Sequence, residues 1–325
     1  MTKKKSAFIV EDDLSNLFGE VEQPSELSND DLTIEEALEQ VVNQMELSGL
    51  RPRTILDYRR YVIALAETCN IRMLNEINAQ SIYAYLTSLN VANSTKLIRL
   101  KCIKAFLERC LGNGWIERPY WRDININVST PVKKETSERD ILYVLSSLDL
   151  SDFMQLRDAA TILIIYQTGI RVRTAALLRE SYVNFNELSI RIPGEDVKNH
   201  DSLVLPIDKR LASILSALIA QNEKVRRFNG VNNDYLFITK TGDNCLKTPT
   251  NNNLARRLNV YRKRFNLENF SAHAIRRAFA KSVYLRSGRD LALVSKALGH
   301  SDFAVTSRYL NLSSDEVAEE LRKYL

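Results

Sequence analysis

Apolar residues in the first third of the chain recur at intervals of three and four, which is the spacing of one face of an α-helix. One such face runs from Ile34 through Ala37, Leu38, Val41, Val42 and Met45 to Leu47. Thr33 precedes it, and threonine is a common residue at the N-cap of a helix. The pattern therefore predicts a helix that begins after Thr33.

Three more helices are predicted in the same region. One begins at Thr54, where Asp57 three positions later makes a start that resembles a capping box, and its stripe includes Val62. Two others cover about 78–89 and 94–111. Four helices of this length predict a small bundle that ends near Trp121.

The fourth predicted helix interleaves basic residues with its apolar stripe. Lys96, Arg99 and Lys101 alternate there with leucines and isoleucines. This face is either an ordinary solvated helix surface or a phosphate-contacting one, and the sequence favours neither. Together with Arg51 and Arg53, which precede the second helix, these three residues are the DNA-contact candidates of the region.

Composition changes at two places along the chain. Residues 1–31 are rich in Asp, Glu, Ser and Asn, which predicts a flexible acidic leader. Residues 122–137 combine small polar residues, a proline and two adjacent lysines without a helical stripe, as expected of a linker. We therefore predict a helical domain over 32–121 and a second domain over 138–325.

The second domain is predicted to be mainly α-helical. Helices are expected over about 138–148 and 151–167, followed by a turn at Gly169 and another helix near 173–180. From Asn251 to the C-terminus the pattern is helical again.

Between these helices the sequence predicts a small edge sheet. Residues 188–207 indicate two short strands joined by a polar turn, and 235–244 adds an extended piece and a turn. The expected fold is mainly α, with a helical bundle followed by an α-rich domain that carries a small antiparallel sheet.

Composition narrows the class of protein. Charged residues make up 26% of the chain, no run of eighteen apolar residues occurs, and the first residues lack the features of a signal peptide. A soluble intracellular protein is expected. The four cysteines form no CxxC pair and have no nearby histidine, so neither a zinc site nor a disulfide framework is indicated.

The charge of the chain is unevenly distributed. Residues 1–35 contain three lysines and nine acidic residues, whereas the remainder has 42 basic and 31 acidic residues, a net charge of +11. A region with this net positive charge favours binding of a polyanionic partner, because lysine and arginine cause the release of counterions when they neutralise phosphates. Many soluble proteins are equally basic, so this signal alone is weak.

Near the C-terminus, a histidine and an arginine stand three residues apart on one predicted helix. Ser271 caps this helix, and a buried stripe at four-residue spacing follows. His273 and Arg276 flank the stripe, where both can reach one shared anion. Alone, this pair would be an ordinary polar edge of a helix.

Further candidate site residues lie at or after predicted turns. Gly299 is a natural C-cap, His300 follows it between two helices, and Tyr309 comes nine residues later. Arg171 follows the glycine turn at a helix junction, and Lys198 lies in the turn of the predicted hairpin.

Taken together, these motifs resemble those of the tyrosine recombinase (phage integrase) family. They are TGIR at 168–171, VK at 197–198 before VLP at 204–206, HAIRRAF at 273–279, LGHS at 298–301 and TSRY at 306–309. The resemblance covers about 140–312 as the catalytic domain. The bundle at 32–121 is similar to the family's SAM-like core-binding domain.

The resemblance implies a site-specific DNA recombinase that needs neither metal nor cofactor. It assigns catalytic positions to Arg171, Lys198, His273, Arg276 and His300, and the nucleophile position to Tyr309. Tyr309 would form a 3′-phosphotyrosine during strand exchange. The biological role is left open between integration and excision of a mobile element or phage, transposition, and resolution of dimers.

The resemblance also implies partners and a location. The partner is double-stranded DNA with inverted-repeat core sites, on which the protein is a homotetramer; without DNA it is a monomer or weak oligomer. No membrane is involved, and the protein is cytoplasmic, associated with the nucleoid when bound to DNA. Val317, Leu321 and Leu325 form an apolar stripe in the tail, which is expected to dock on a neighbouring protomer.

One position departs from the family pattern. Thr174 stands where the family usually has a carboxylate three residues after the first arginine. This departure favours the alternative reading, a catalytically impaired DNA-binding regulator of the same fold. A helical interaction protein that does not bind DNA is a second, remote alternative.

Overall fold

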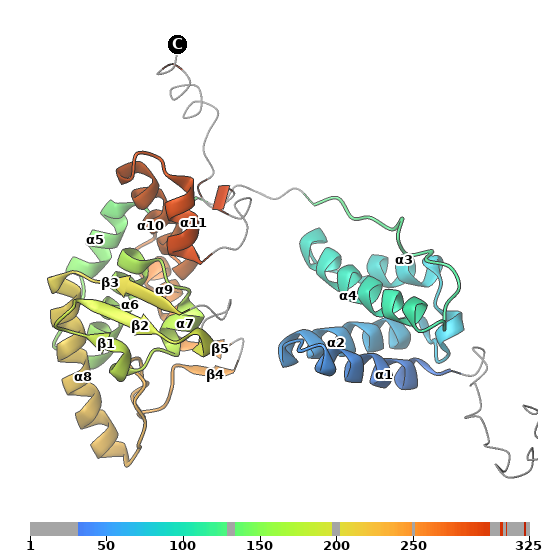
Figure 1. Cartoon of the computed structure of the whole chain (residues 1–325), viewed down its shortest axis with the longest axis horizontal. Helices are drawn as coiled ribbons and strands as arrows, with labels where there is room; N and C mark the ends of the chain where they lie inside the picture. The colour runs from blue at the N-terminus through green and yellow to red at the C-terminus, as the bar shows by residue number, and fades with distance from the viewer. Residues whose placement is uncertain are drawn as a thin grey trace, which may run out of the picture. The chain divides into compact units, whose positions relative to one another are not determined.

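The computed structural model of the chain describes residues 32–128, 134–196, 202–248 and 251–299, together with residues 306, 307, 310 and 322. The acidic leader predicted for 1–31 lies outside the described residues. Contacts divide the chain into two compact units, Met1–Thr130 and Pro131–Leu325 (Figure 1). No helix in the described part of the chain is long and apolar enough to cross a membrane.

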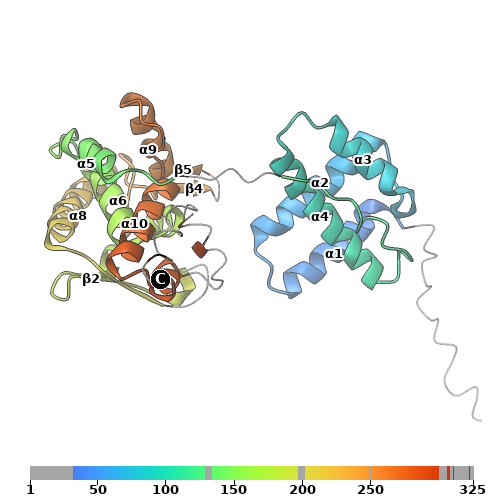
Figure 2. The same ribbon diagram turned by 90° about the horizontal axis from the view of Figure 1, so that it is seen from above.

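The first unit is the predicted bundle of four helices. They are α1 (Ile34–Leu47), α2 (Pro52–Cys69), α3 (Ala79–Ser88) and α4 (Asn93–Gly112). Helix α2 contacts the other three (Figure 2). Tyr85, Phe106 and Trp121 are among the largest side chains buried in the core between them. Large apolar residues buried at helical spacing are what stabilises such a bundle.

The start of α1 agrees with the sequence, and that of α2 does not. Thr33 Oγ1 accepts a hydrogen bond from Glu36 N at 3.2 Å, and Glu36 Oε2 accepts one from Thr33 N at 3.0 Å, which is a complete capping box. The predicted start of the second helix at Thr54 is wrong. Pro52 occupies the first helical position, where its fixed φ favours the helix and its missing N–H costs nothing. Asp57 forms an ion pair with an arginine four residues earlier instead of a cap.

The second unit contains seven described helices and two small sheets. The helices are α5 (Glu138–Ser146), α6 (Phe153–Thr168), α7 (Val172–Ala176), α8 (Lys209–Asn229), α9 (Asn253–Arg264), α10 (Ala272–Arg286) and α11 (Leu291–Leu298). An antiparallel sheet has the order β1 (Val183–Asn184), β2 (Ser189–Ile192), β3 (Leu203–Pro206), and β4 (Leu246–Thr248) pairs with β5 (Asn251–Asn252). The predicted mainly α fold with a small antiparallel sheet is confirmed.

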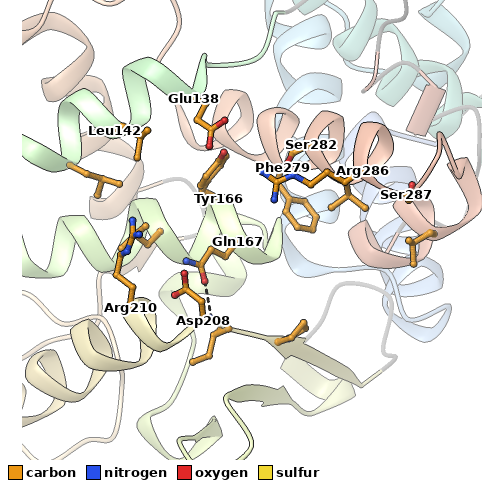
Figure 3. Close-up of a pocket in the computed structure, with 16 residues that line it drawn as sticks. Glu138, Leu142, Tyr166, Gln167, Asp208, Arg210, Phe279, Ser282, Arg286 and Ser287 are labelled. Carbon is orange, nitrogen blue, oxygen red and sulfur yellow. Dashed lines mark hydrogen bonds between the residues drawn. The ribbon is translucent and has the colours of Figure 1, made fainter.

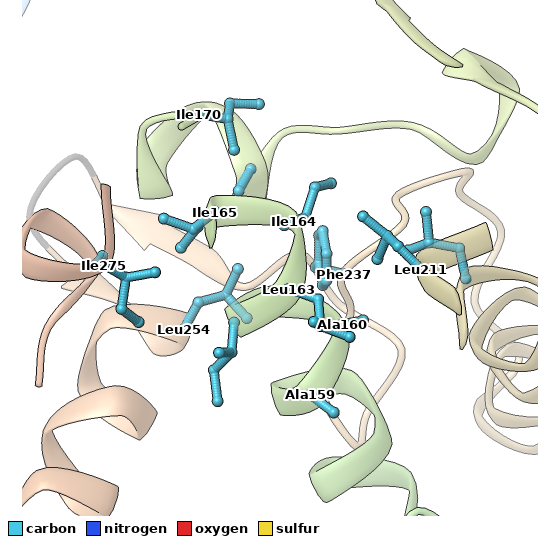
Figure 4. Close-up of a cluster of buried hydrophobic side chains, with 14 of the residues drawn as sticks. Ala159, Ala160, Leu163, Ile164, Ile165, Ile170, Leu211, Phe237, Leu254 and Ile275 are labelled. Carbon is cyan, nitrogen blue, oxygen red and sulfur yellow. The ribbon is translucent and has the colours of Figure 1, made fainter. Parts of the chain in front are cut away.

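Helix α6 is the centre of this unit. Eleven of its sixteen residues are buried and the other five are half-buried, and it packs against both α8 and α10. Figure 4 shows Ile165 of α6 on the side of Leu254 of α9 and Ile275 of α10, and Ile164 on the side of Leu211 of α8. A helix that is covered on all sides belongs in a core. The elements that carry the candidate site are therefore fixed to one common core.

The structure differs from the sequence prediction between α7 and α9. The helix expected near 173–180 ends at Ala176, and a 3₁₀ turn and β1 follow it. The long helix α8 was not predicted. In residues 235–244, the predicted extended piece forms only isolated bridges, from Tyr235 to Arg179 and within the segment. The predicted turn is present, because Gly242 N donates to the carbonyl oxygen of Thr239 at 3.0 Å.

A buried polar network joins α6 to α9. The Arg157 side chain is fully buried and donates hydrogen bonds to Asp158 Oδ1 at 2.9 Å and to the carbonyl oxygen of Ile238 at 3.0 Å. Asp158 Oδ2 accepts one from Arg257 Nε and one from the Tyr261 hydroxyl, each at 2.7 Å. Buried charges are tolerated only when they are paired in this way, so the network fixes α9 against the central helix.

The four cysteines carry no disulfide. Burial raises the pKa of the Cys110 thiol to about 12 and that of Cys245 to about 11. Because the thiolate is the reactive species, these two side chains are chemically inert parts of the two cores.

Candidate active site

Three of the six predicted catalytic side chains are described. Arg171, His273 and Arg276 belong to the second unit, whereas Lys198, His300 and Tyr309 lie outside the described residues. The described part of the site therefore comprises the two arginines, the histidine and the segments that lead to the other three residues.

A glycine turn delivers Arg171 to the site. Helix α6 ends at Gly169, whose φ of 64° and ψ of 14° lie in the left-handed region. Two residues later Arg171, with a φ of −69° and a ψ of 139°, is the N-cap residue of α7. The turn thus places this arginine at the junction of two helices, as its position in the sequence predicted.

Gly169 is also closely covered by side chains. A Cβ atom built on it would lie 2.5 Å from Cε1 of Phe279 in α10 and 3.1 Å from Cδ2 of Leu298 in α11. Real Cβ contacts are longer than the first of these distances. The glycine therefore satisfies two requirements, a left-handed turn and close approach of three helices.

Replacing Gly169 by alanine is expected to lower the free energy of unfolding by about 2–4 kcal/mol, from left-handed strain plus overpacking against Phe279. Gly230→Ala is the matched control, because Gly230 has a φ of 65° and a Cβ there would meet nothing within 4 Å. This control should lose only the strain component, about 1–2 kcal/mol. Denaturant unfolding of both variants gives the comparison, and equal losses would contradict the close packing at Gly169.

The first turn of α10 carries the histidine. Ser271 is its N-cap, and its Oγ accepts a hydrogen bond from Ala274 N at 3.2 Å. His273 is exposed in this turn, and Arg276, one turn further on, is only 3% exposed. The segment before α5 holds this turn in place, because Thr136 N donates to the carbonyl oxygen of Ala274 at 3.2 Å.

Arg276 joins three helices. Its Nη1 donates to the carbonyl oxygen of Gly169 at the end of α6, and its Nη2 donates to that of Leu298 at the end of α11, at 2.7 Å. Both acceptors lie at helix C-termini, where the partial negative charge of the helix dipole favours a cation. These two bonds use two of the five N–H donors of a guanidinium and fix the plane of the group.

These contacts bring together segments that are distant in sequence. Arg276 contacts the residue two positions before Arg171 and the residue two positions before His300. Leu310, the residue after Tyr309, is 2% exposed and lies in an apolar cluster with Leu298. Arg276 is thus the point at which the segments leading to Arg171 and His300 converge.

The basic residues predicted to contact DNA in the first unit have different environments. Arg53 forms an ion pair with Asp57 at 3.0 Å. Arg99 Nη1 donates to the hydroxyl of Tyr85 at 3.3 Å, and its guanidinium lies 5.3 Å from the ring centroid of Tyr61. These bonds give both arginines a role within the bundle.

The other three predicted DNA-contact residues differ from one another in exposure. Lys101 is exposed and Lys96 is half-buried. Since Lys101 is two residues from Arg99, the two side chains leave α4 on different sides. Arg51 is exposed and precedes α2. The five positions do not form a single stripe along one helix.

A groove of about 900 Å³ lies on another part of the second unit, between α5, α6, α10 and α11 (Figure 3). Its wall combines apolar residues such as Leu142 and Leu293 with charged ones such as Arg286. Burial and a hydrogen bond with Glu138 raise the pKa of Tyr166 in this wall to about 12. Neither Arg171 nor His273 lines the groove.

No group of three or more metal-ligating side chains is present within the described ranges. The described part of the candidate site consists instead of two guanidinium groups and an imidazole. Such groups bind anions through charge-assisted hydrogen bonds. A phosphate is the ligand that this chemistry fits best.

Family models match both units. The phage integrase family model matches residues 137–316, and the model of the phage integrase N-terminal SAM-like domain matches residues 37–117. A relative, the tyrosine recombinase XerC of Roseiflexus castenholzii, is 25% identical over 300 residues, which cover 87% of this chain and 89% of that protein.

Solved structures share the fold. The Tn1549 transposon integrase in complex with a circular intermediate DNA aligns with a TM-score of 0.67 at 13% identity, covering 90% of this chain and 99% of that one. The lambda integrase tetramer bound to a Holliday junction aligns with a TM-score of 0.66 at 13% identity, covering 91% and 83%. The family model alone covers more than half of the sequence, and with it the chain belongs to the phage integrase family of tyrosine-type site-specific recombinases.

Proposed function

We propose that this recombinase cuts one DNA strand by attack of the Tyr309 hydroxyl on a phosphodiester. The phosphorus–O5′ bond breaks, and the chain becomes linked to the 3′ end of the DNA through a phosphotyrosine. The observation that carries the proposal is the convergence at Arg276, whose two carbonyl partners lie next to the segments of Arg171 and His300. Leu310, the residue after Tyr309, belongs to the same buried apolar cluster as one of these partners, Leu298.

The two arginines stabilise the phosphate under attack. Negative charge grows on its non-bridging oxygens in the transition state, and fixed cations with N–H donors oppose that charge most effectively when they are already in place. Arg276 is held at the ends of two helices, so its guanidinium needs little reorganisation. Arg171 enters the site from the α6–α7 turn.

The step includes two proton transfers, one from the attacking Tyr309 hydroxyl and one to the leaving O5′. Tyrosine has an ordinary pKa of about 10, so its hydroxyl must lose a proton during attack, and His273 on the exposed first turn of α10 is the proposed base. The leaving O5′ takes a proton from Lys198. His300 hydrogen-bonds the phosphate or positions Tyr309.

The phosphotyrosine preserves the phosphodiester, so a second 5′ hydroxyl can attack it and release the tyrosine. Two rounds of this exchange recombine two duplexes. The proposed substrate is double-stranded DNA with inverted-repeat core sites. The proposed location of the protein is the cytoplasm. The proposed assembly is a homotetramer on two duplexes, as the lambda integrase tetramer on a Holliday junction suggests; without DNA the chain is a monomer or weak oligomer.

A strand-exchange assay tests the function. Two duplexes of different length, each with the cognate core site, are incubated with the protein in EDTA and without ATP. Recombinant duplexes should appear at the rate seen with added Mg²⁺. Recombination only after Mg²⁺ is added would contradict a metal-free tyrosine mechanism.

Thr174 supplies the second candidate function. It occupies the middle of α7, close to Arg171 in sequence, and carries no charge. A catalytically impaired regulator would bind the core site and exchange no strands in the same assay. That outcome would replace the recombinase proposal for this chain.

The tail is proposed to link neighbouring protomers. Val317, Leu321 and Leu325 lie outside the described residues, and their four-residue spacing provides one apolar face if the segment is helical. Deleting residues 315–325 should abolish tetramer assembly on DNA and leave binding of one protomer to a half-site unchanged. Sedimentation of the complexes distinguishes these species. A tetramer of unchanged stability in the truncated chain would show that the tail has no such role.

A further inference from the structure

Helix α7, which begins directly after Arg171, has only five residues. A helix of this length is not stable by itself, because the first turn costs more conformational entropy than its hydrogen bonds return. Its position therefore depends on neighbouring groups. Ala175 and Ala176 are fully buried and hold the far end of α7 in the core.

The beginning of α7 is held by a side chain from another element. Asn252, the last residue of β5, donates from Nδ2 to the carbonyl oxygen of Val172 at 3.0 Å. Val172 is the first residue of α7 and directly follows Arg171. Arg276 binds the carbonyl oxygen of Gly169 on the other side of Arg171. Hydrogen bonds thus hold the backbone on both sides of Arg171, at Gly169 and at Val172.

Asn252 is itself firmly anchored. Its Oδ1 accepts hydrogen bonds from Leu254 N at 3.0 Å and Ala255 N at 3.4 Å, so the same side chain is the N-cap of α9. Leu254 and Leu258 of α9 are buried in the main core. The amide group of Asn252 therefore connects the start of α9 to the first peptide of α7. Its oxygen caps α9, and its nitrogen donates to the carbonyl oxygen of Val172.

We propose that Asn252 is a positioning residue for Arg171, acting through its hydrogen bond to Val172. The bond fixes the start of α7 and with it the direction in which the Arg171 side chain leaves the backbone. This inference rests on the proposed role of Arg171 in phosphate binding. In this chain the side chain three residues after Arg171 is uncharged, and the tether comes instead from a residue distant in sequence.

The variant Asn252→Asp separates the two tasks of the amide. Aspartate keeps an oxygen to cap α9 but replaces the Nδ2 donor by an oxygen that repels the Val172 carbonyl. Single-turnover cleavage of saturating nicked core-site DNA should be about 10–100-fold slower, as expected for a misplaced catalytic group. The dissociation constant for the same DNA should change less than about threefold, because the separate phosphate contacts that dominate affinity persist.

The neighbouring residue provides a matched control. Asn253 Oδ1 accepts a hydrogen bond from Arg157 of α6, and the residue has the same chemistry as Asn252. Asn253→Asp should leave cleavage within about threefold of wild type, since aspartate retains the acceptor. Asn252→Ser keeps a capping oxygen that is too short to reach Val172, and it should reproduce the slow cleavage of Asn252→Asp if that variant folds poorly.

A double-mutant cycle distinguishes positioning from a general structural effect. If Asn252 acts through Arg171, then Asn252→Asp should slow cleavage less than about twofold in an Arg171→Lys background. Equal slowing in both backgrounds would overturn the positioning role and leave the proposed function intact. Unchanged cleavage in Asn252→Asp and Asn252→Ser would do the same. Failure of the wild-type chain to cleave core-site DNA that it binds would instead remove the proposed function, and the positioning role with it.

Discussion

Replacing Tyr309 by phenylalanine is expected to abolish strand cleavage, with a loss on the order of 10⁶-fold, because no other atom of the side chain can attack phosphorus. Phenylalanine keeps the ring and removes only the hydroxyl oxygen. DNA binding should therefore remain within about threefold of wild type. Single-turnover cleavage and a binding titration on the same core-site DNA measure the two quantities.

The matched control for this substitution is Tyr143→Phe. Tyr143 is 53% exposed on α5, and its ring packs edge-on against Phe265, a contact that phenylalanine preserves. Cleavage by this control should equal that of wild type. Residual cleavage in Tyr309→Phe at more than a hundredth of the wild-type rate would mean that another residue is the nucleophile.

The second large effect is expected for Arg276→Lys, which should slow cleavage by about 10²–10³-fold at saturating DNA. Lysine keeps the positive charge, but its single ammonium cannot reproduce the planar fork that spans the carbonyl oxygens of Gly169 and Leu298. A buried carbonyl that loses its donor costs about 1–3 kcal/mol of stability, so the melting temperature should also fall.

Arg277→Lys controls for the change in chemistry. Arg277 is the next residue on α10 and donates to the carbonyl oxygen of Lys134 at 3.3 Å. Its replacement should leave cleavage within about threefold of wild type. Cleavage is compared at a temperature at which circular dichroism shows both variants folded. Equal rates for Arg276→Lys and Arg277→Lys would contradict the central position of Arg276.

Local signals in the sequence predicted most helices because each signal reports a nearby hydrogen bond or one buried face. Thr33, the predicted N-cap of the first helix, is such a signal, and the structure contains this cap. Helix α8 was missed although Asp208 caps it and Gly230 ends it. Helix α2 begins two residues before the predicted start at Thr54, because Pro52 occupies the first helical position, which proline favours.

The order of the catalytic candidates was readable from motifs, but their spatial relations were not. No local pattern indicates that Arg276 binds the carbonyl oxygens of Gly169 and Leu298, since these contacts span 107 and 22 residues. The hydrogen bond from Asn252 to Val172 could not be predicted for the same reason. Asparagine before the apolar stripe of α9 marks a helix N-cap, whereas the bond of its other amide end to α7 depends on the tertiary fold.

The covalent bond between Tyr309 and DNA tests the central claim most directly. The wild-type chain is incubated in EDTA with a core site nicked next to the cleavage position. The short fragment that carries the free 5′ hydroxyl then diffuses away, and the covalent intermediate accumulates. The complex is digested with nuclease and trypsin and analysed by mass spectrometry. We expect a nucleotide linked through its 3′ phosphate to Tyr309 in the peptide of residues 309–322. A nucleotide on any other residue, or no adduct on core-site DNA that the protein binds, would contradict the proposed mechanism.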